Sequence, residues 1–219
     1  MHIAEGVIPG PVLGAGALLA AAGVAAGLRK LDEDRMAPVA VLSSTLFVAS
    51  LIHVPVGPAA AHLVLNGLAG LILGWAVFPS FLVALLLQAV FFGYGGLTTL
   101  GLNTLNMALP GVACYYLFNH SLMGSSGRKT FVLGFATGAL SIALSCGMLC
   151  VSLLTAGREL LVLAQGVFLA HIPLMILEGL VTGSAVVFLR RVRPEVFAHS
   201  TDAANPLELD ARDAFEQNA

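Results

Sequence analysis

The chain consists of long apolar runs separated by short polar or Gly/Pro-rich connections. A helix that spans the hydrocarbon core of a bilayer needs ~20 residues. The first, sixth and last of seven runs reach that length, so the pattern predicts an all-α integral membrane protein with seven transmembrane helices. The seven runs cover residues 7–28, 37–52, 59–76, 77–93, 102–119, 130–156 and 160–189.

The second to fifth runs are shorter, and proline and glycine interrupt them. Interrupted segments occur where non-helical backbone lines a cavity enclosed by protein. We therefore expect the functional region within residues 53–110. The interrupting residues are Pro55, Pro58, Pro79, Gly95, Gly96 and Pro110.

The composition supports a membrane protein and excludes some functions. Of the 219 residues, 58% are hydrophobic and 10% are charged, whereas soluble domains carry roughly 25% charged residues. The net charge of −2 argues against a nucleic-acid partner. The sequence contains neither G-x-x-x-x-G-K-[ST] nor H-E-x-x-H, so a protein that moves an ion with ATP would need a separate ATPase. Repeated small residues at i, i+4 spacing, such as Gly10/Gly14 and Gly134/Gly138, predict close helix contacts.

Basic residues predict the orientation. They follow the first, fifth and seventh runs, and with seven helices these positions share one side of the membrane. The positive-inside rule then places the N-terminus outside and the C-terminus in the cytoplasm. Residues 1–28 have no basic region before the apolar stretch, so we expect Met1 and His2 to be retained. Residues 1–193 are expected to form the membrane domain, and 194–219 an acidic, disordered cytoplasmic tail.

Two histidines far apart in the sequence are expected at the same membrane depth. The Met1 amine, the His2 amide nitrogen and the His2 imidazole form a three-nitrogen chelate, and nitrogen ligands suit Ni(II), Cu(II) and cobalt. His62 begins a later run one turn inside the outer face, so Met1, His2 and His62 are the candidate metal ligands. Asn66, four residues on, could hold the second nitrogen of His62. The alternative is that His62 only hydrogen-bonds a neighbouring helix.

The last run carries His171, Met175 and Glu178 on one helix face. By helix rise, His171 and Glu178 lie ~10 Å apart, so they do not chelate one ion together. Both a polar pair that braces helix contacts and a role beneath the metal site remain open. His53 is either a loop residue or a group that collects metal ions.

Several segments resemble the CbiM/NikM family, the substrate-binding membrane subunits of energy-coupling-factor transporters for cobalt and nickel. The resemblance covers about residues 1–195. It is carried by the start Met1-His2-Ile3-Ala4-Glu5-Gly6 and by the segments 53–67, 95–108, 170–179 and 192–195. The family usually has proline at the fourth position, where this chain has Ala4, a difference that removes no ligand.

The resemblance implies seven helices and an N-terminus tucked into the outer face. It also implies that the Met1 amine, the His2 amide and imidazole, and His62 bind the metal in a near-planar arrangement. Asn103 and Asn106 would support that site. The implied partners are a CbiQ/NikQ-like coupling subunit, two CbiO/NikO-like ATPases and a small accessory membrane subunit.

The sequence therefore favours a subunit of the cytoplasmic (inner) membrane that captures Co(2+) or Ni(2+) as transported substrate. Cobalt would serve cobalamin biosynthesis. One alternative is a membrane enzyme using His62, His171 and Glu178, but the sequence offers no convergent nucleophile, base and oxyanion donors. Another is a stand-alone secondary transporter, which would be expected to show an internal repeat; none is visible.

Overall fold

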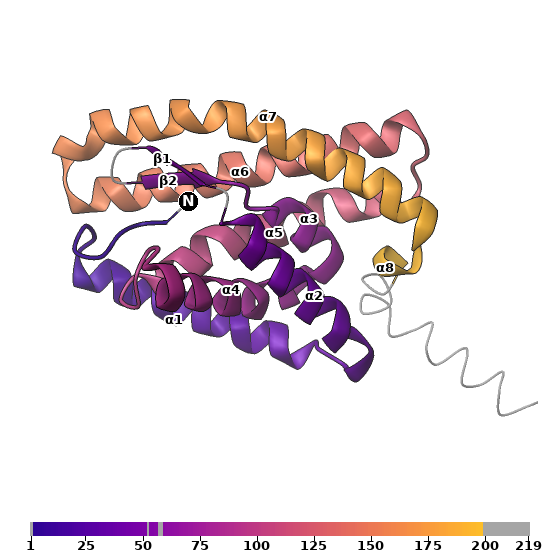
Figure 1. Cartoon of the computed structure of the whole chain (residues 1–219), viewed down its shortest axis with the longest axis horizontal. Coiled ribbons are helices and arrows are strands. Elements are labelled where there is room, and N and C mark those ends of the chain that lie inside the picture. The colour runs from indigo at the N-terminus through magenta and orange to yellow at the C-terminus, as the bar shows by residue number, and fades with distance from the viewer. Residues whose placement is uncertain (1, 52, 57–58, 199–219) are drawn as a thin grey trace, which may run out of the picture.

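The computed structural model describes residues 2–51, 53–56 and 59–198, so Met1 and nearly all of the expected acidic tail lie outside the described part. Helices dominate the described part, and the longest lie side by side along one axis (Figure 1). The helices are α1 (Gly10–Arg29), α2 (Glu33–Ala49), α3 (Asn66–Leu73), α4 (Val77–Phe92), α5 (Leu100–Met123), α6 (Arg128–Ala156), α7 (Leu161–Val192) and α8 (Glu195–Ala198), with single 3-10 turns at Gly74–Ala76 and Arg158–Leu160.

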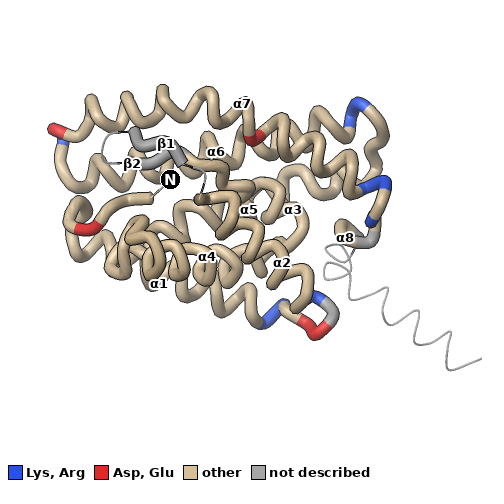
Figure 2. Tube along the Cα trace, viewed as in Figure 1, with Lys and Arg blue, Asp and Glu red and all other residues tan. Residues whose placement is uncertain are grey.

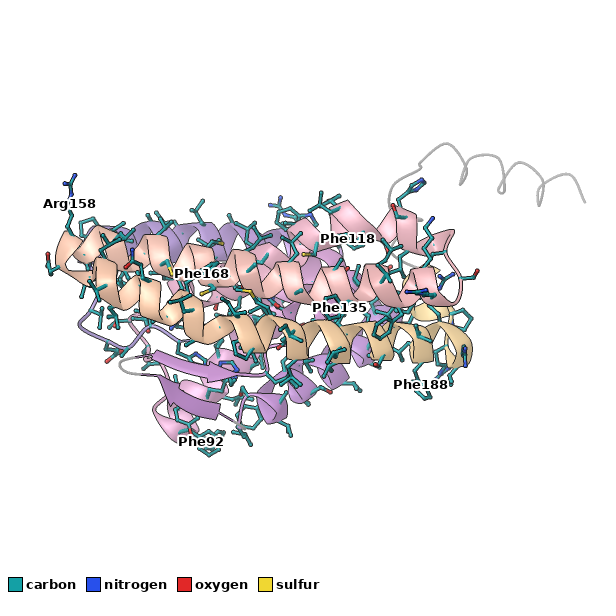
Figure 3. The ribbon with its side chains drawn as sticks, turned by 90° about the horizontal axis from the view of Figure 1, so that it is seen from above. Phe92, Phe118, Phe135, Arg158, Phe168 and Phe188 are labelled. Carbon is teal, nitrogen blue, oxygen red and sulfur yellow. The ribbon has the colours of Figure 1, made fainter. Side chains whose placement is uncertain are left out.

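The described part of the chain is helical as expected, except for one short β-hairpin. Strand β1 (His53–Val56) pairs antiparallel with β2 (Ala59–His62), and His53 lies directly opposite His62. The run 59–76 was expected to be helical from its start, which is wrong for residues 59–62. Proline has no N–H to donate and disfavours helical geometry in the residue before it, and Pro55 and Pro58 fall in this segment. The hairpin lies beside α7 (Figures 1 and 3).

Helix α3 is short and lies in the interior of the protein. All eight of its residues are buried. It runs in the same direction as α5, because the Asn66 side chain bonds to the Met107 carbonyl and Gly70 abuts Gly111, four residues further along each helix. A Cβ on Gly70 would lie 2.2 Å from the Gly111 carbonyl oxygen, so the two backbones touch.

The chain reverses direction at Gly74, which has a φ of 54°. The Trp75 indole donates a 2.9 Å hydrogen bond to the Tyr116 hydroxyl, near the end of α5. Helix α4 packs against α5 and starts at that end, so it runs antiparallel to α3 and α5. The contiguous apolar stretch 66–92 thus contains two helical segments of opposite direction.

Helices α6 and α7 form the longest antiparallel pair, and glycine allows their close contact. A Cβ on Gly134 would lie 2.9 Å from the Cα of Gly183, and one on Gly138 would lie 2.5 Å from the Glu178 carbonyl oxygen. The expected small-residue contact is therefore confirmed for this pair. Around Gly14 on α1, by contrast, no described atom lies within 4 Å of an added Cβ.

By length and composition, four helical stretches of the described chain could cross a membrane: Gly10–Arg29, Asn66–Phe92, Arg128–Ala156 and Arg158–Val192; Arg35–Ala49 is apolar but shorter. Of these, Asn66–Phe92 is the stretch that reverses direction at Gly74. Apolar side chains also project outward, as Phe168 and Phe188 do with 41% and 62% of their surface exposed (Figure 3). Lysine and arginine gather at the end where α1 stops and α6 starts (Figure 2).

Packing continues past the predicted domain boundary at residue 193. The short helix α8 contacts α3, α5 and α7, and its Phe197 is only 1% exposed. The first residues of the expected tail therefore belong to the packed protein.

Candidate metal site

The N-terminal segment is held against the start of α5 by one asparagine. The Ile3 N–H donates to the Asn103 Oδ1 at 2.9 Å, and the Asn103 Nδ2 donates to the Ile3 carbonyl at 3.2 Å. The same Nδ2 also lies 3.2 Å from the Thr99 hydroxyl. Because Asn103 satisfies both backbone groups of Ile3, it fixes the residue that directly follows His2.

A second connection binds the same segment to the loop before α5. The Glu5 Oε1 accepts hydrogen bonds from the Thr98 N–H at 2.9 Å and from its hydroxyl at 3.1 Å. The Thr98 backbone bond is the main cause that lowers the pKa of Glu5 from its usual value of 4.5. Gly96 has a φ of +142°, and a Cβ there would lie 2.1 Å from the Glu5 Cγ, so this contact requires glycine.

The two candidate imidazoles meet in the protein interior. The His2 and His62 rings stack with centroids 4.7 Å apart and planes inclined by 21°. Their residues are 6% and 4% exposed. The His62 Nδ1 lies 3.0 Å from the Leu63 carbonyl oxygen. A carbonyl only accepts, so Nδ1 carries the hydrogen and Nε2 keeps the lone pair that a metal requires.

Two further aromatic rings stack in sequence from His2. Tyr94 stacks on His2 at 6.3 Å, and Phe92 stacks on Tyr94 at 5.7 Å. Gly95 allows the close approach, because a Cβ there would lie 3.0 Å from the Asn103 Nδ2 and 3.6 Å from the His2 Cβ. The sequence reasoning missed Tyr94, although its place beside the Gly95-Gly96 pair was an available signal.

Acidic, cysteine and histidine side chains alone do not form a complete metal site in the described part of the chain. Among the described residues, no three His, Cys, Asp or Glu side chains converge closely enough to hold an ion. Two imidazoles alone make a weak, incomplete set, whereas the His2 amide and the N-terminal amine would complete four nitrogen ligands. Met1 itself lies outside the described residues.

Glu178 contacts the chain just after His62. It is 0% exposed. Its Oε1 accepts from the Val64 and Leu65 N–H groups, the latter at 2.9 Å, and its Oε2 lies 3.1 Å from the Leu65 nitrogen. The carboxylate therefore binds backbone N–H groups just before α3. This is a structural contact, and it is neither metal chelation nor acid/base chemistry.

Asn66 does not share a helix face with His62, because His62 ends strand β2 and Asn66 starts α3. The Asn66 amide nitrogen donates to the Met107 carbonyl at 3.2 Å and to the Ser145 hydroxyl at 2.8 Å. The predicted bond to the second nitrogen of His62 is therefore wrong, since the Leu63 carbonyl accepts from that nitrogen.

The remaining candidates have their own surroundings in the described part of the chain. The His171 Nδ1 bonds to the Val167 carbonyl at 2.7 Å, within its own helix. Asn106 is buried one turn after Asn103, and its Nδ2 has no hydrogen-bond partner among the described residues. Met175 packs against the hydrophobic core. The backbone of His53 lies directly opposite His62 in the hairpin.

The known proteins that this chain resembles are metal transport proteins. A sequence model of the CbiM family, described as the cobalt uptake substrate-specific transmembrane region, matches residues 2–196. The chain is 44% identical over 199 residues to a Haemophilus influenzae protein named as a metal transport protein, covering 90% of this chain and 96% of that one. It is 34% identical to the cobalt transport protein CbiM of Sorangium cellulosum, covering 90% and 94%.

A third relative and a solved structure extend the comparison. The chain is 33% identical to the fused nickel transport protein NikMN of Rhodobacter capsulatus, covering 82% of this chain and 58% of that one. A crystal structure of a transition metal transporter superposes with a TM-score of 0.76 at 22% identity, covering 94% of this chain and all of that one. At this identity the superposition establishes the shared fold.

Proposed function

Because the chain belongs to the CbiM family of cobalt-uptake transmembrane proteins, we propose that it is the subunit that captures Co(2+) or Ni(2+) for an energy-coupling-factor transporter. Its named relatives are transport proteins, and it is a membrane component of cobalt or nickel uptake. In the proposed cycle, metal binds at the outer face of the cytoplasmic membrane. ATP hydrolysis on partner subunits then reorients the protein so that it releases the ion inward.

The stacking of His2 on His62 is the observation that carries this proposal. The two residues are 60 positions apart in the sequence, and both are buried. His2 is held in place by the two hydrogen bonds between Asn103 and the Ile3 backbone, which we call the Asn103 clamp, and by the Glu5–Thr98 contact. We propose four metal ligands: the Met1 amine, the His2 amide and imidazole nitrogens, and the His62 Nε2. Such a nitrogen set suits Ni(II), and imidazole also suits cobalt.

The distribution of charge supports the proposed orientation. Basic residues gather at the end of the bundle where α1 stops and α6 starts, whereas the N-terminal segment lies toward the other end (Figures 1 and 2). Basic residues favour the cytoplasmic side, so we propose that the N-terminus faces outward. The hairpin followed by α3 would then form the third of seven membrane crossings.

The proposed partners follow from what the chain lacks and from the architecture of a relative. The sequence has no phosphate-binding motif of the type G-x-x-x-x-G-K-[ST]. A relative from Methanocorpusculum labreanum, 29% identical, is named as a fused cobalt transport protein, CbiMQ. We propose a CbiQ/NikQ-like coupling subunit, two ATPases and a small accessory membrane subunit as partners of this chain.

The decisive experiment compares full chains that are extended at the C-terminus or at the N-terminus. We expect protein purified with a C-terminal tag to bind one Ni(2+) or Co(2+) per chain by titration calorimetry. A residue added before Met1 converts the amine into an amide and should abolish binding without loss of folding. Equal affinity in both proteins would contradict the proposed ligands, and absence of binding in both would contradict metal capture.

A further inference from the structure

Helix α3 has no capping side chain of its own at either end, although the whole helix is buried. The residue before it, Leu65, has a φ of 56° and offers no side-chain cap, and Gly74 ends it without one. Unsatisfied end groups are costly where water is excluded. Two charged residues from other helices provide the missing partners.

Glu178 of α7 binds the N-terminal end, and Arg35 of α2 binds the C-terminal end. The Arg35 Nη2 donates to the carbonyls of Ile72 and Leu73 at 3.4 and 3.2 Å. The carboxylate thus lies at the positive end of the helix dipole and the guanidinium at the negative end, the favourable arrangement at both. Glu178 and Arg35 should therefore stabilise α3 in the same way, each at one end of the helix.

Of these two residues, only Glu178 is also connected to His62 by hydrogen bonds. The Leu63 carbonyl, which accepts from the His62 Nδ1, belongs to the same peptide bond as the Val64 N–H, which donates to Glu178. A single peptide group therefore links the carboxylate to the imidazole. Hydrogen bonds in such a chain polarise and strengthen one another.

Metal-binding histidines commonly donate their second ring nitrogen to a carboxylate or a carbonyl, which fixes the tautomer and increases the basicity of the ligand. We propose that Glu178 is a positioning residue of the metal site: through the 63–64 peptide it holds the Nδ1–H tautomer of His62 and aims its Nε2 at the metal. The inference rests on the proposed function, since it assigns Glu178 a role toward the same ion.

The test compares Glu178→Gln with the matched control Arg35→Gln in the full chain with a C-terminal tag. In Glu178→Gln, one carboxylate oxygen becomes an amide oxygen and the other becomes an NH2 group. The NH2 group cannot accept a hydrogen bond from the backbone N–H groups of Val64 and Leu65. We expect Ni(2+) affinity to fall ~10–100-fold, as for other partners of metal-binding histidines. Arg35→Gln should lower the melting temperature in detergent to a similar extent and leave Ni(2+) affinity unchanged.

A readout of the ring itself separates positioning from general loss of stability. In metal-free protein labelled with 15N-histidine, His62 should show the Nδ1–H tautomer, with its signals identified by their loss in His62→Gln. Glu178→Gln should shift His62 toward the Nε2–H tautomer, and Arg35→Gln should not. If Glu178→Gln does not fold, the wild-type spectrum still decides, because an Nε2–H tautomer there overturns the proposal.

The remaining outcomes are also distinct. Equal Ni(2+) affinity in wild type and Glu178→Gln overturns the role of Glu178 and leaves metal capture intact. Equal losses of affinity in Glu178→Gln and Arg35→Gln show that α3 stability alone is responsible, which also overturns it. Absence of Ni(2+) binding by the wild-type chain refutes the proposed function itself.

Discussion

At the scale of single residues, asparagine takes the place of a β-strand partner. Asn103 offers an acceptor and a donor to the Ile3 backbone, as a neighbouring strand would. A free N-terminal segment would lose much of its conformational entropy on binding an ion. Because Asn103 already holds residue 3, much of that entropy is lost on folding, which favours tight metal binding.

We predict that Asn103→Ala weakens metal binding by leaving the buried N–H and carbonyl of Ile3 without partners. An unsatisfied buried group costs about 1–3 kcal/mol, so the clamped arrangement should lose a large part of its population. Calorimetry with Ni(2+) would measure the loss. Asn103→Asp keeps the acceptor but not the donor, and it should give an intermediate affinity; affinity equal to wild type in both variants would contradict the clamp.

Metal affinity should fall steeply as pH decreases from 8 to 6. An ordinary N-terminal amine has a pKa of ~7.7–8.0 and an ordinary imidazole one near ~6.5, so protons compete with a metal for ligands of these types in this pH range. Metal binding must also displace the amide proton. Titration calorimetry in buffers of different ionisation enthalpy would count the protons released. A count near zero at pH 7 would argue against the amine–amide–imidazole ligands.

The Glu5–Thr98 contact should not contribute to that pH dependence. Thr98 lowers the pKa of Glu5 below 4.5, so the carboxylate form is favoured in the folded protein. Its stabilising effect is present above the unfolded pKa and is lost only as pH falls through the lower, folded value. The contact therefore stays intact between pH 6 and 8. Titration calorimetry should show the same dependence of Ni(2+) affinity on pH in Glu5→Gln as in the wild-type protein.

At the scale of elements, the packing of α3 depends on glycine. Its backbone touches that of α5 at Gly70 and Gly111, which allows a short helix to be enclosed completely. In a membrane, where lipid is as apolar as the helix faces, close backbone packing replaces much of the hydrophobic driving force. This packing sets the depth at which α3 begins and therefore where His62 ends its strand.

We predict that Gly70→Ala destabilises the fold by about 1–3 kcal/mol, the usual range for overpacking a core. The added Cβ would overlap the Gly111 carbonyl, so the two backbones would have to separate. Thermal unfolding in detergent would report the loss. Gly14→Ala is the matched control, since no described atom lies near the new Cβ, and a similar loss there would contradict the packing argument.

At the scale of the whole molecule, the N-terminal segment and the β-hairpin lie away from the end where lysine and arginine gather (Figures 1 and 2). Arg158 lies near one end of the long axis (Figure 3), whereas lysine and arginine gather at the other end (Figure 2). Since positive charge is retained on the cytoplasmic side, this arrangement supports the orientation that we propose.

Cysteine labelling in intact cells checks the orientation. An impermeant maleimide should label Glu159→Cys, in the exposed turn between α6 and α7, without permeabilisation. Ser126→Cys, in the exposed turn between α5 and α6, should react only after the membrane is opened. The native cysteines Cys114 and Cys146 are buried and serve as a low background. The reverse labelling pattern would invert the proposed topology.

The sequence by itself determined the membrane class and the order of the long helices, and it predicted His2 and His62 as metal ligands. Runs of apolar residues, loop charges and a chelating terminus are local properties, which do not depend on how the helices pack. Even the α6–α7 contact could be predicted, because glycine at i, i+4 spacing is itself a packing signal.

Only the tertiary structure decided the path of residues 53–74 and the partners of the buried polar groups. Ala59, Ala60 and Ala61 favour helix as isolated residues, yet they pair with β1 because the fold positions an antiparallel strand beside them. Glu178 meets the Leu63–Val64 peptide region only because α3 starts against the middle of α7. A long-range hydrogen bond depends on the relative placement of two elements, which no local pattern of residues encodes.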